Sequence, residues 1–441
     1  MSQGKKAKTG FGLAISHSGV ILRISVVGTG YVGLITGCGF AKLGHKVSCV
    51  DIDKNKVEKI NRGEPPIYEK GLGELLKEVA GKNLTATADI GPSVSGAELV
   101  FIAVGTPSRE DGAMDNTYVE KAFLEAVSYA DSSKAIVVKS TVVPGTTDSL
   151  AALAEKKLGK KAGLDYGLLM SPEFLREGRA VDDFFNPDRI VIGANDSKTA
   201  EKLASLYAGF KCPVMKTDLK TAEMIKYASN AFLATKVSFA NEIGNLCKAL
   251  SIDVYEVMDG VGMDKRIGRS FLNAGIGYGG SCFPKDVKAI VSCFKQNGIE
   301  PKILSKVIEV NDEQPYKIVE IAKKKIKLNG KKVAVLGLSF KPDSDDMREA
   351  PSIKVIEKLL DGGAKVKAYD PQAIGNARKI FGGKIDYAKT QKEALDYSDT
   401  VFILTEWEAF RDEKLYAGKI VFDGRKVLQK KSGSDYDGVC W

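Results

Sequence analysis

Residues 22–33 read LRISVVGTGYVG, a short strand rich in β-branched residues that runs directly into a glycine-rich turn. The apolar stretch that follows predicts a helix to about Leu43, and residues 46–50 predict a second strand that Asp51 closes. This strand–turn–helix–strand order, with G-x-G-x-x-G at the turn, is typical of a dinucleotide-binding βαβ unit. The sequence therefore predicts an α/β fold that holds a dinucleotide at the start of the helix.

The residues of this unit also indicate which dinucleotide binds. Gly28 allows the tight turn, Gly30 lets the backbone approach a pyrophosphate, and Gly33 lets helix and strand pack closely. Asp51 is placed to accept hydrogen bonds from both ribose hydroxyls. A carboxylate there repels a 2′-phosphate, so NAD is favoured over NADP.

Length and composition narrow the class of protein. The chain has 441 residues, 44% of them hydrophobic, which predicts several domains with ample core. Its net charge of +9 is not gathered into a basic stripe, so we expect anionic small molecules and no nucleic acid as partners. No apolar run is long enough for a bilayer, so no membrane is expected, and residues 1–20 are expected to be a flexible leader.

Cysteine and histidine usage limits the chemistry. The seven cysteines form no C-x-x-C pair, so neither a disulfide framework nor a metal site is indicated, which fits a cytoplasmic protein. The only histidines are His17 and His45. Because histidine is the commonest general base, a site in this chain has to use lysine, carboxylates, threonine or water instead.

A second glycine-rich stretch, GIGYGGSCFPKD at residues 275–286, leads directly to Cys282. Its four glycines suggest that the backbone of this stretch comes close to another group, such as a ligand or another part of the chain. Lys285 and Asp286 follow the cysteine, and a cationic neighbour favours the nucleophilic thiolate. The alternative is a glycine-rich turn that carries a buried, inert cysteine.

Polar residues follow further expected strands. Residues 98–104 and 135–139 read as buried strands that lead to Thr106 and Thr141, and residues 168–170 lead to an acidic and basic cluster at 173–177. Ligands of open α/β sheets bind beyond the carboxyl ends of strands, which makes these residues candidates. Ordinary turn chemistry and a solvated loop are the alternatives.

Residues 219–250 predict one long helix, with Thr217 or Asp218 as N-cap. Lys226 and Asn230 are four residues apart and share one face, where they read as a partly buried polar pair or as a solvated face. The helix is long enough to link domains and to form an oligomer interface. An apolar stripe recurs along it every seven residues, at Ile225, Phe232, Phe239 and Leu246.

The C-terminal part repeats the βαβ pattern without the fingerprint. Residues 332–336 predict a strand that ends at Gly337, and a helix and a second strand ending at Asp370 follow. No second glycine follows Gly337, so this half should not bind a dinucleotide in the same way. The fold class expected is α/β, with two Rossmann-like doubly wound domains joined by a long central helix. The expected domains are 21–215 (NAD-binding), 216–315 (central, helical, dimerisation) and 316–441 (the second Rossmann-like domain), with a loose tail after about residue 430.

Six motifs in this order resemble the UDP-glucose/GDP-mannose dehydrogenase family, over about residues 22–430. They are GTGYVG at 28–33, STVVPGT at 140–146, SPEFLREG at 171–178, KYASNAFLATK at 226–236, GYGGSCFPKD at 277–286 and SFKPDSDDMREAP at 339–351. The motif at 343–346, DSDD, differs slightly from the usual form and leaves Lys341 and Arg348 in place. Phe283-Pro284 resembles the members of the family that oxidise UDP-glucose, and Ser281 stands where the N-acetylmannosamine branch usually has histidine.

The resemblance implies an enzyme that performs a four-electron oxidation of UDP-glucose to UDP-glucuronate with two NAD and one active site. Cys282 would attack the intermediate aldehyde, and the thiohemiacetal would become a thioester that water hydrolyses. Lys226 would stabilise oxyanions, Asn230 would position oxygen 6, and Asp286 with an ordered water would be the general base. Thr141 and Glu173 would hold that water.

The resemblance also implies that the domain 316–441 binds the UDP-sugar. It further implies two sets of binding residues and an oligomer. For NAD the set is Gly28, Gly30, Tyr31, Val32, Gly33, Asp51, Lys56, Thr106, Thr141, Glu177, Lys285 and Arg348. For the sugar nucleotide it is Glu173, Phe174, Leu175, Arg176, Lys226, Asn230, Arg266, Phe271, Gly275, Gly279 and Lys341, with Lys341 at the diphosphate. Arg266 matches an arginine that reaches the substrate of a neighbouring subunit, so a homodimer or higher homo-oligomer is expected.

Other functions remain open at this level. The same chemistry on GDP-mannose or a UDP-N-acetylhexosamine is the main alternative. A two-electron β-hydroxyacid dehydrogenase would also pair a Rossmann domain with a helix lysine and asparagine, but Cys282 and the third domain argue against it. A non-catalytic sugar-nucleotide sensor is the alternative from another class, and the intact reactive residues disfavour it.

Overall fold

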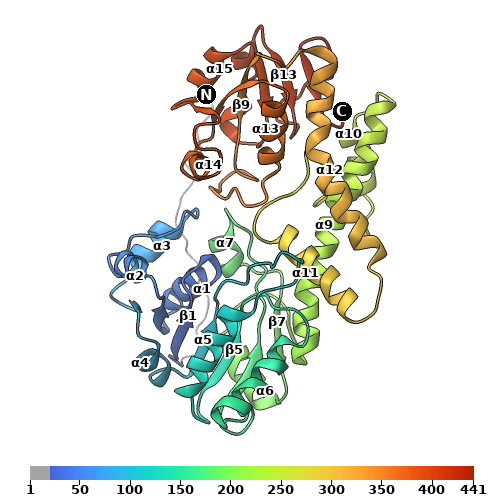
Figure 1. The fold of residues 1–441 in the computed structure, drawn as a ribbon. Helices are drawn as coiled ribbons and strands as arrows, with labels where there is room; N and C mark the ends of the chain where they lie inside the picture. The colour runs from blue at the N-terminus through green and yellow to red at the C-terminus, as the bar shows by residue number, and fades with distance from the viewer. Residues whose placement is uncertain (1–19) are drawn as a thin grey trace, which may run out of the picture.

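The computed structural model describes residues 20–441, so the flexible leader expected over 1–20 lies outside the described residues except for Val20. Two sheets lie at opposite ends of the molecule, and the helices α9 (Leu219–Ala249) and α12 (Lys302–Lys325) run alongside one another along one side and link the two parts (Figure 1). The predicted long central helix is therefore confirmed to within one residue at its C-terminal end. Asp218 is its N-cap and accepts from the backbone N–H of Thr221.

The N-terminal sheet has eight strands in the order β3-β2-β1-β4-β5-β6-β7-β8, and all neighbours are parallel except β6 and β7. Its central strands are buried on both faces because helices cover both. The strands are β1 (Arg23–Val27), β2 (Lys46–Val50), β3 (Leu84–Thr87), β4 (Leu99–Ile102), β5 (Ala135–Val138), β6 (Gly167–Met170), β7 (Ile190–Ala194) and β8 (Val214–Thr217). The helices of this part are α1 (Tyr31–Lys42), α2 (Lys54–Asn61), α3 (Leu72–Val79), α4 (Ile90–Ser95), α5 (Thr117–Ser128), α6 (Thr146–Leu158), α7 (Ala180–Phe185) and α8 (Ser197–Ser205).

The C-terminal sheet has six parallel strands in the order β11-β10-β9-β12-β13-β14. Both sheets thus contain the strand order 3-2-1-4-5-6 of doubly wound folds, which confirms the predicted fold class. The strands are β9 (Lys332–Leu336), β10 (Lys365–Tyr369), β11 (Asp386–Tyr387), β12 (Thr400–Ile403), β13 (Ile420–Asp423) and β14 (Tyr436–Gly438). The remaining helices are α10 (Val254–Gly262), α11 (Phe283–Gln296), α13 (Pro351–Asp361), α14 (Ile374–Phe381), α15 (Gln391–Tyr397), η1 (Glu408–Phe410) and η2 (Glu413–Tyr416).

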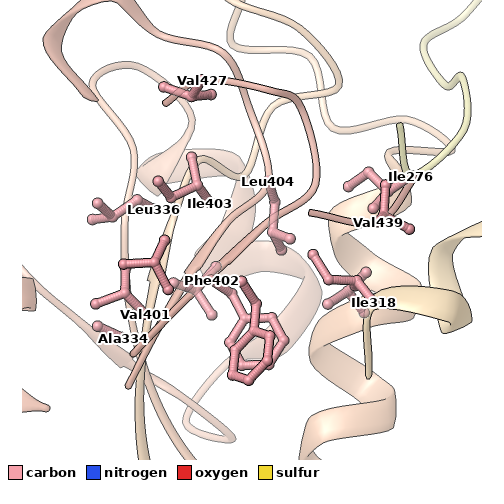
Figure 2. Close-up of a cluster of buried hydrophobic side chains, with 14 of the residues drawn as sticks. Ile276, Ile318, Ala334, Leu336, Val401, Phe402, Ile403, Leu404, Val427 and Val439 are labelled. Atoms are coloured by element: carbon pink, nitrogen blue, oxygen red, sulfur yellow. The ribbon is translucent and has the colours of Figure 1, made fainter. Parts of the chain in front are cut away.

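The core of the C-terminal part joins its sheet to the central helices. Val401, Phe402 and Ile403 of β12 are fully buried, and Ile318 of α12 packs into the same cluster (Figure 2). Ile276, from the glycine-rich stretch, also lies in this cluster and is fully buried. A loop between two helices is therefore anchored in the core of the third domain.

The expectation of a loose tail after residue 430 is wrong. Strand β14 pairs in parallel with β13, and the side chain of Trp441 is buried. Lys248 of α9 and Lys325 of α12 both form ion pairs with Asp437. The polar composition of the tail thus reflects contacts with lysines of two helices.

Three of the four residues of the apolar stripe of α9 are exposed in the single chain, and the fourth, Ile225, is half-buried against the core of the N-terminal part. The exposed fractions are 65% for Phe232, 49% for Phe239 and 57% for Leu246, whereas the buried residues of the helix are mostly small or polar. Within residues 20–441, no helix combines the length and the hydropathy that crossing a membrane requires.

Candidate functional site

The candidate site lies at the carboxyl ends of β4, β5 and β6, between the N-terminal sheet, α9 and the start of α11. Cys282 is the N-cap residue of α11 and its side chain is exposed. Its Sγ lies 3.6 Å from the hydroxyl of Ser281. The cysteine is therefore accessible, which disfavours the alternative of a buried, inert thiol.

Lys226 and Glu173 form a buried ion pair in this site. The distance from Nζ to Oε1 is 3.0 Å, and the side chains are 4% and 5% exposed. Desolvation lowers the pKa of Lys226, but the charges of Glu173, Cys282 and Asp286 outweigh it, so the pKa is raised. The structure thus holds a permanent positive charge at a position where water is largely excluded.

Asn230, one turn further along α9, contacts the first turn of α11. Its Nδ2 donates to Oδ2 of Asp286 at 2.7 Å, and both side chains are buried. Lys285 donates to the other oxygen of Asp286, and its Nζ lies 3.5 Å from the hydroxyl of Thr106. The predicted buried polar pair on α9 is therefore present, and each member contacts a different carboxylate. Thr141 lies partly buried just beyond β5.

The charge environment of Cys282 differs from the sequence expectation. Desolvation and the nearby Glu173 raise the pKa of the thiol, and Lys226 only partly opposes them. Lys285, the expected cationic neighbour, pairs with Asp286 instead. The neutral thiol is thus favoured at rest, because a crowded cleft with two carboxylates outweighs one lysine.

The start of α1 has the properties of a dinucleotide site. Gly28 has a φ of +98°, and a Cβ at Gly33 would lie 1.9 Å from the carbonyl oxygen of Gly28, so only glycine allows this turn. No side chain caps the N-terminus of α1, and the space beside Gly30 is open. The first backbone N–H groups of the helix are therefore available to an anion.

Asp51 completes this site at the end of β2. Its Oδ2 accepts from the backbone N–H of Thr29 at 2.9 Å, and Lys56 lies 3.7 Å away. Desolvation raises the pKa of Asp51, but the hydrogen bonds from Thr29 and Asp53 and the charge of Lys56 more than reverse this, so the pKa is lowered. The ionised carboxylate can accept hydrogen bonds from ribose hydroxyls, and the uncapped helix end can bind a pyrophosphate. The two together fit NAD.

Tyr31 and Val32 occupy the first turn of α1. Desolvation, followed by the charges of Glu69 and Glu177, raises the pKa of Tyr31, so the phenol stays neutral. Val32 packs against the core of the N-terminal part.

Residues of the C-terminal part reach across to the 173–178 loop. Lys341 donates to the carbonyl oxygen of Glu177, and Arg348 lies 3.8 Å from the Glu177 carboxylate. Burial and the charge of Asp346 raise the pKa of Glu177 to about 7, against the attraction of Arg348 and Lys341. The structure thus brings together residues that are predicted to bind NAD and residues that are predicted to bind the sugar nucleotide.

Three other residues that are predicted to bind the sugar nucleotide, Phe174, Leu175 and Arg176, form contacts within the protein. Arg176 donates from its guanidinium and its backbone N–H to Asp183, so it braces the loop. The backbone N–H of Leu175 donates to Glu173, and the ring of Phe174 lies under the guanidinium of Arg189 at 3.8 Å.

Phe271 and Arg266, which are also predicted to bind substrate, lie in different surroundings. Phe271 has a φ of +65°, and its ring centroid is 5.9 Å from that of Phe283, next to Cys282. Arg266 is separate from these contacts: it pairs with Asp264, and 89% of its side chain is exposed. A single chain therefore does not bring Arg266 to its own site.

The glycines before Cys282 lie close to the backbone of the C-terminal part. A Cβ at Gly275 would lie 2.7 Å from the carbonyl oxygen of Gly424, and a Cβ at Gly279 would lie 2.4 Å from that of Glu349. Both glycines are needed because the backbone of the C-terminal part packs directly against them.

Sequence reasoning missed Arg425. Its guanidinium donates to the carbonyl oxygen of Gly277 at 2.8 Å and to that of Phe340 at 3.5 Å. It follows β13 at the carboxyl end of a parallel strand, which is the signal that could have found it. It joins the loop before Cys282 to the motif that contains Lys341.

Known proteins match this chain in all three parts. Residues 22–211 match the NAD binding domain of the UDP-glucose/GDP-mannose dehydrogenase family, residues 220–313 match its central domain, and residues 334–430 match its UDP binding domain. The chain is 43% identical to the UDP-glucose 6-dehydrogenase AglM of Haloferax volcanii, over 95% of this chain and 100% of that protein. It is also 43% identical to YwqF, a UDP-glucose 6-dehydrogenase of Bacillus subtilis, over 92% and 93% of the two chains.

A solved structure agrees with these matches. The UDP-glucose dehydrogenase of Pyrobaculum islandicum superposes with a TM-score of 0.90 at 40% identity, and the match covers 96% of this chain and 99% of that one. The resemblance read from six motifs is therefore confirmed, and the chain belongs to the UDP-glucose/GDP-mannose dehydrogenase family.

Proposed function

We propose that this protein oxidises UDP-glucose to UDP-glucuronate with two molecules of NAD, through intermediates bound to Cys282. The observation that carries the proposal is the position of this accessible thiol at the start of α11. It lies beside a fixed positive charge on Lys226 and beside a carboxylate, Asp286, that Asn230 and Lys285 hold. Membership of the family and the UDP-glucose 6-dehydrogenase relatives support the choice of substrate.

NAD, when bound at the start of α1, supplies the hydride acceptor for both oxidations. Asp51 binds the ribose hydroxyls, and the free N–H groups at Gly30 and beyond bind the pyrophosphate. The other proposed contacts come from residues around the cleft: Gly28, Tyr31, Val32, Gly33, Lys56, Thr106, Thr141, Glu177, Lys285 and Arg348.

In the first oxidation the primary alcohol of the sugar loses a hydride, gives a proton through the ordered water to Asp286 and becomes an aldehyde. The ammonium of Lys226 stabilises the negative charge that develops on oxygen 6, and the amide of Asn230 positions this oxygen. Because Lys226 is 4% exposed, its charge acts where water screens it little.

In the second oxidation the sulfur of Cys282 adds to the aldehyde carbon. The resulting thiohemiacetal loses a second hydride, gives its hydroxyl proton through the ordered water to Asp286 and becomes a thioester, and water then displaces the sulfur, which leaves as the thiol. Since the thiol is neutral at rest, its proton passes to the aldehyde oxygen as the carbon–sulfur bond forms. Asp286 is the proposed base that activates the hydrolytic water, which Thr141 and Glu173 hold.

The sugar nucleotide binds between the 173–176 segment, the 271–279 loop and the third domain. Lys341 is the proposed partner of the diphosphate, and the 173–176 backbone with Phe271, Gly275 and Gly279 shapes the pocket. Arg266 is proposed to act on the substrate of a second subunit, which its exposure and its separation from the other site residues support.

The exposed apolar stripe of α9 supports a homodimer or higher homo-oligomer, with Phe232, Phe239 and Leu246 at the contact. The proposed domains are 21–215, 216–315 and 316–441, and helix α12 runs across the boundary between the last two. A thiol that has to stay reduced supports a cytoplasmic location.

The test is the number of NADH formed per UDP-glucose consumed when the sugar nucleotide is limiting. We expect a ratio of about two, which requires both oxidations on one substrate. A ratio near one would mean that the reaction stops at the aldehyde. If UDP-glucose gives no NADH but GDP-mannose or a UDP-N-acetylhexosamine does, the substrate is that other sugar nucleotide. If UDP-glucose binds tightly and no sugar nucleotide gives NADH, the protein is a sensor.

A further inference from the structure

The stretch from Gly275 to Gly280, here called the 275–280 loop, is buried along its whole length although it contains no regular structure. Figure 2 shows how it is anchored: Ile276 lies beside Val439 and near Ile318, within the core of the C-terminal part. Cys282 follows this loop after one further residue. The position of the thiol therefore depends on how the loop is held.

Three side-chain amides hold the backbone of this loop. Asn241 of α9 accepts from the N–H of Gly275 at 2.8 Å, and Gln314 of α12 donates to the carbonyl oxygen of the same residue at 2.8 Å. Asn311 of α12 accepts from the N–H of Tyr278 at 2.8 Å and donates to its carbonyl oxygen at 3.1 Å. An amide offers a donor and an acceptor side by side, so Asn311 pairs with Tyr278 as a neighbouring strand would.

Pro315 interrupts the hydrogen bonding of α12 at the turn that contacts the 275–280 loop. Proline has no N–H, so inside α12 it leaves the carbonyl oxygen of Asn311 without its usual helical donor. Gly277 packs against this turn with a φ of +97°. A Cβ at Gly277 would lie 2.8 Å from Oδ1 of Asn311 and 3.4 Å from its carbonyl oxygen, so only glycine fits.

We propose that Asn311 and Gln314, on the turn of α12 that Pro315 opens, are positioning residues for Cys282, together with Asn241 of α9. They fix the 275–280 loop at Gly275 and at Tyr278 before any ligand binds, and they do so through the backbone. The loop in turn aims the thiol at the carbon whose oxygen Lys226 and Asn230 hold. This inference rests on the proposed function, and none of the three amides contacts the reacting atoms.

Isosteric changes separate this role from general packing. Asn311→Asp and Gln314→Glu keep the shape of each side chain but replace the N–H₂ donor that faces a carbonyl oxygen with an oxygen atom. The first hydride transfer does not use the sulfur, whereas the second follows the attack of the sulfur on the aldehyde. Loss of positioning should therefore slow the second oxidation more than the first.

The first experiment compares the two oxidations in each variant at saturating UDP-glucose and NAD. We expect the rate of the single-turnover NADH burst to stay within about threefold of the unmodified protein, and the steady-state kcat to fall at least about tenfold. The number of NADH per UDP-glucose should fall below two, with free aldehyde trapped by hydroxylamine. Gln296→Ala, at the exposed end of α11, is the matched amide control and should change neither value. Equal slowing of both oxidations, or an unchanged kcat, would overturn the inference.

The second experiment needs no substrate, so it distinguishes failure of this inference from failure of the proposed function. Alkylation of Cys282 by iodoacetamide is followed by mass spectrometry in the full-length protein at pH 7.5. A loosened loop lets the thiol move away from the crowded cleft and from Glu173, which raise its pKa, so we expect alkylation at least about threefold faster in Asn311→Asp and Gln314→Glu. Alkylation at the unmodified rate in both variants would overturn the positioning role. If one variant fails to give a cooperative melting transition, the other decides the result.

Discussion

The side-chain amide of Asn230 donates to one carboxylate oxygen of Asp286 at 2.7 Å, while the ammonium of Lys285 binds the other oxygen. Both oxygens are thus held, and the carboxylate is 2% exposed. Two elements that are distant in the sequence, α9 and α11, are joined at this one carboxylate. The contact fixes the candidate base one turn of helix away from Cys282.

Asp286→Asn should leave the thioester on Cys282. The change keeps the shape of the side chain but removes the base that activates water, which is expected to lower kcat by about 10²–10⁴-fold. Intact-mass spectrometry during turnover should detect a covalent adduct on the protein. Absence of an adduct with an unchanged kcat would assign the base to another residue.

Cys282→Ser should abolish steady-state formation of the acid and leave NAD binding unchanged. The hydroxyl of serine is a far weaker nucleophile than a thiol, so the aldehyde would not be captured. The measurement is UDP-glucuronate by chromatography, with NAD affinity by titration. Acid formation near the rate of the unmodified protein would mean that the mechanism is not covalent.

Lys226→Met should slow the first hydride transfer by about 10²–10³-fold, because it removes the charge opposite the developing oxyanion. It also leaves the carboxylate of Glu173 buried without its partner, so the melting temperature should fall. The double variant Lys226→Met/Glu173→Gln should recover stability without recovering the NADH burst. An unchanged burst in the single variant would contradict the oxyanion role.

Glu177 should make stability fall as pH rises. Burial is the main cause that raises its pKa from 4.5 to about 7, so the folded state keeps a proton that the unfolded state has already released. Between about pH 4.5 and pH 7 the free energy of unfolding therefore decreases with pH, by roughly 3 kcal/mol at most. Glu177→Gln should melt higher than the unmodified protein at pH 8, and the difference should vanish toward pH 4.5.

The control for this pH dependence is Glu408→Gln, which changes a carboxylate whose side chain is 91% exposed. Its melting temperature should follow that of the unmodified protein at every pH. A difference between Glu177→Gln and the unmodified protein that does not change with pH would show that Glu177 does not titrate in this range.

Phe239→Glu should weaken the oligomer. Phe239 lies in the exposed apolar stripe of α9, and a carboxylate at a subunit contact would have to be buried without a partner. Sedimentation velocity should show a shift toward the single chain at micromolar concentration. Ile303→Glu is the control, since Ile303 is 71% exposed and lies outside the stripe. An unchanged sedimentation coefficient would place the subunit contact elsewhere.

The sequence by itself determined the fold class and the chemical groups of the site. The turn at Gly28 is specified locally, because its φ and its contact with Gly33 allow no other residue. The pairing of Lys226 with Asn230 on one face followed from helix geometry alone. The order of six motifs then identified the family, since each motif is a short segment whose spacing can be read directly.

The tertiary structure alone decided the surroundings of these groups. The sequence gives no sign that Asn230 would bind Asp286, or that desolvation would outweigh Lys226 at Cys282, because both depend on groups from separate elements. It also did not reveal that the glycines before Cys282 accommodate Asn311 and the backbone of the C-terminal part. Local patterns set backbone conformation and side-chain type, whereas pKa values and close packing depend on atoms that only the folded chain brings together.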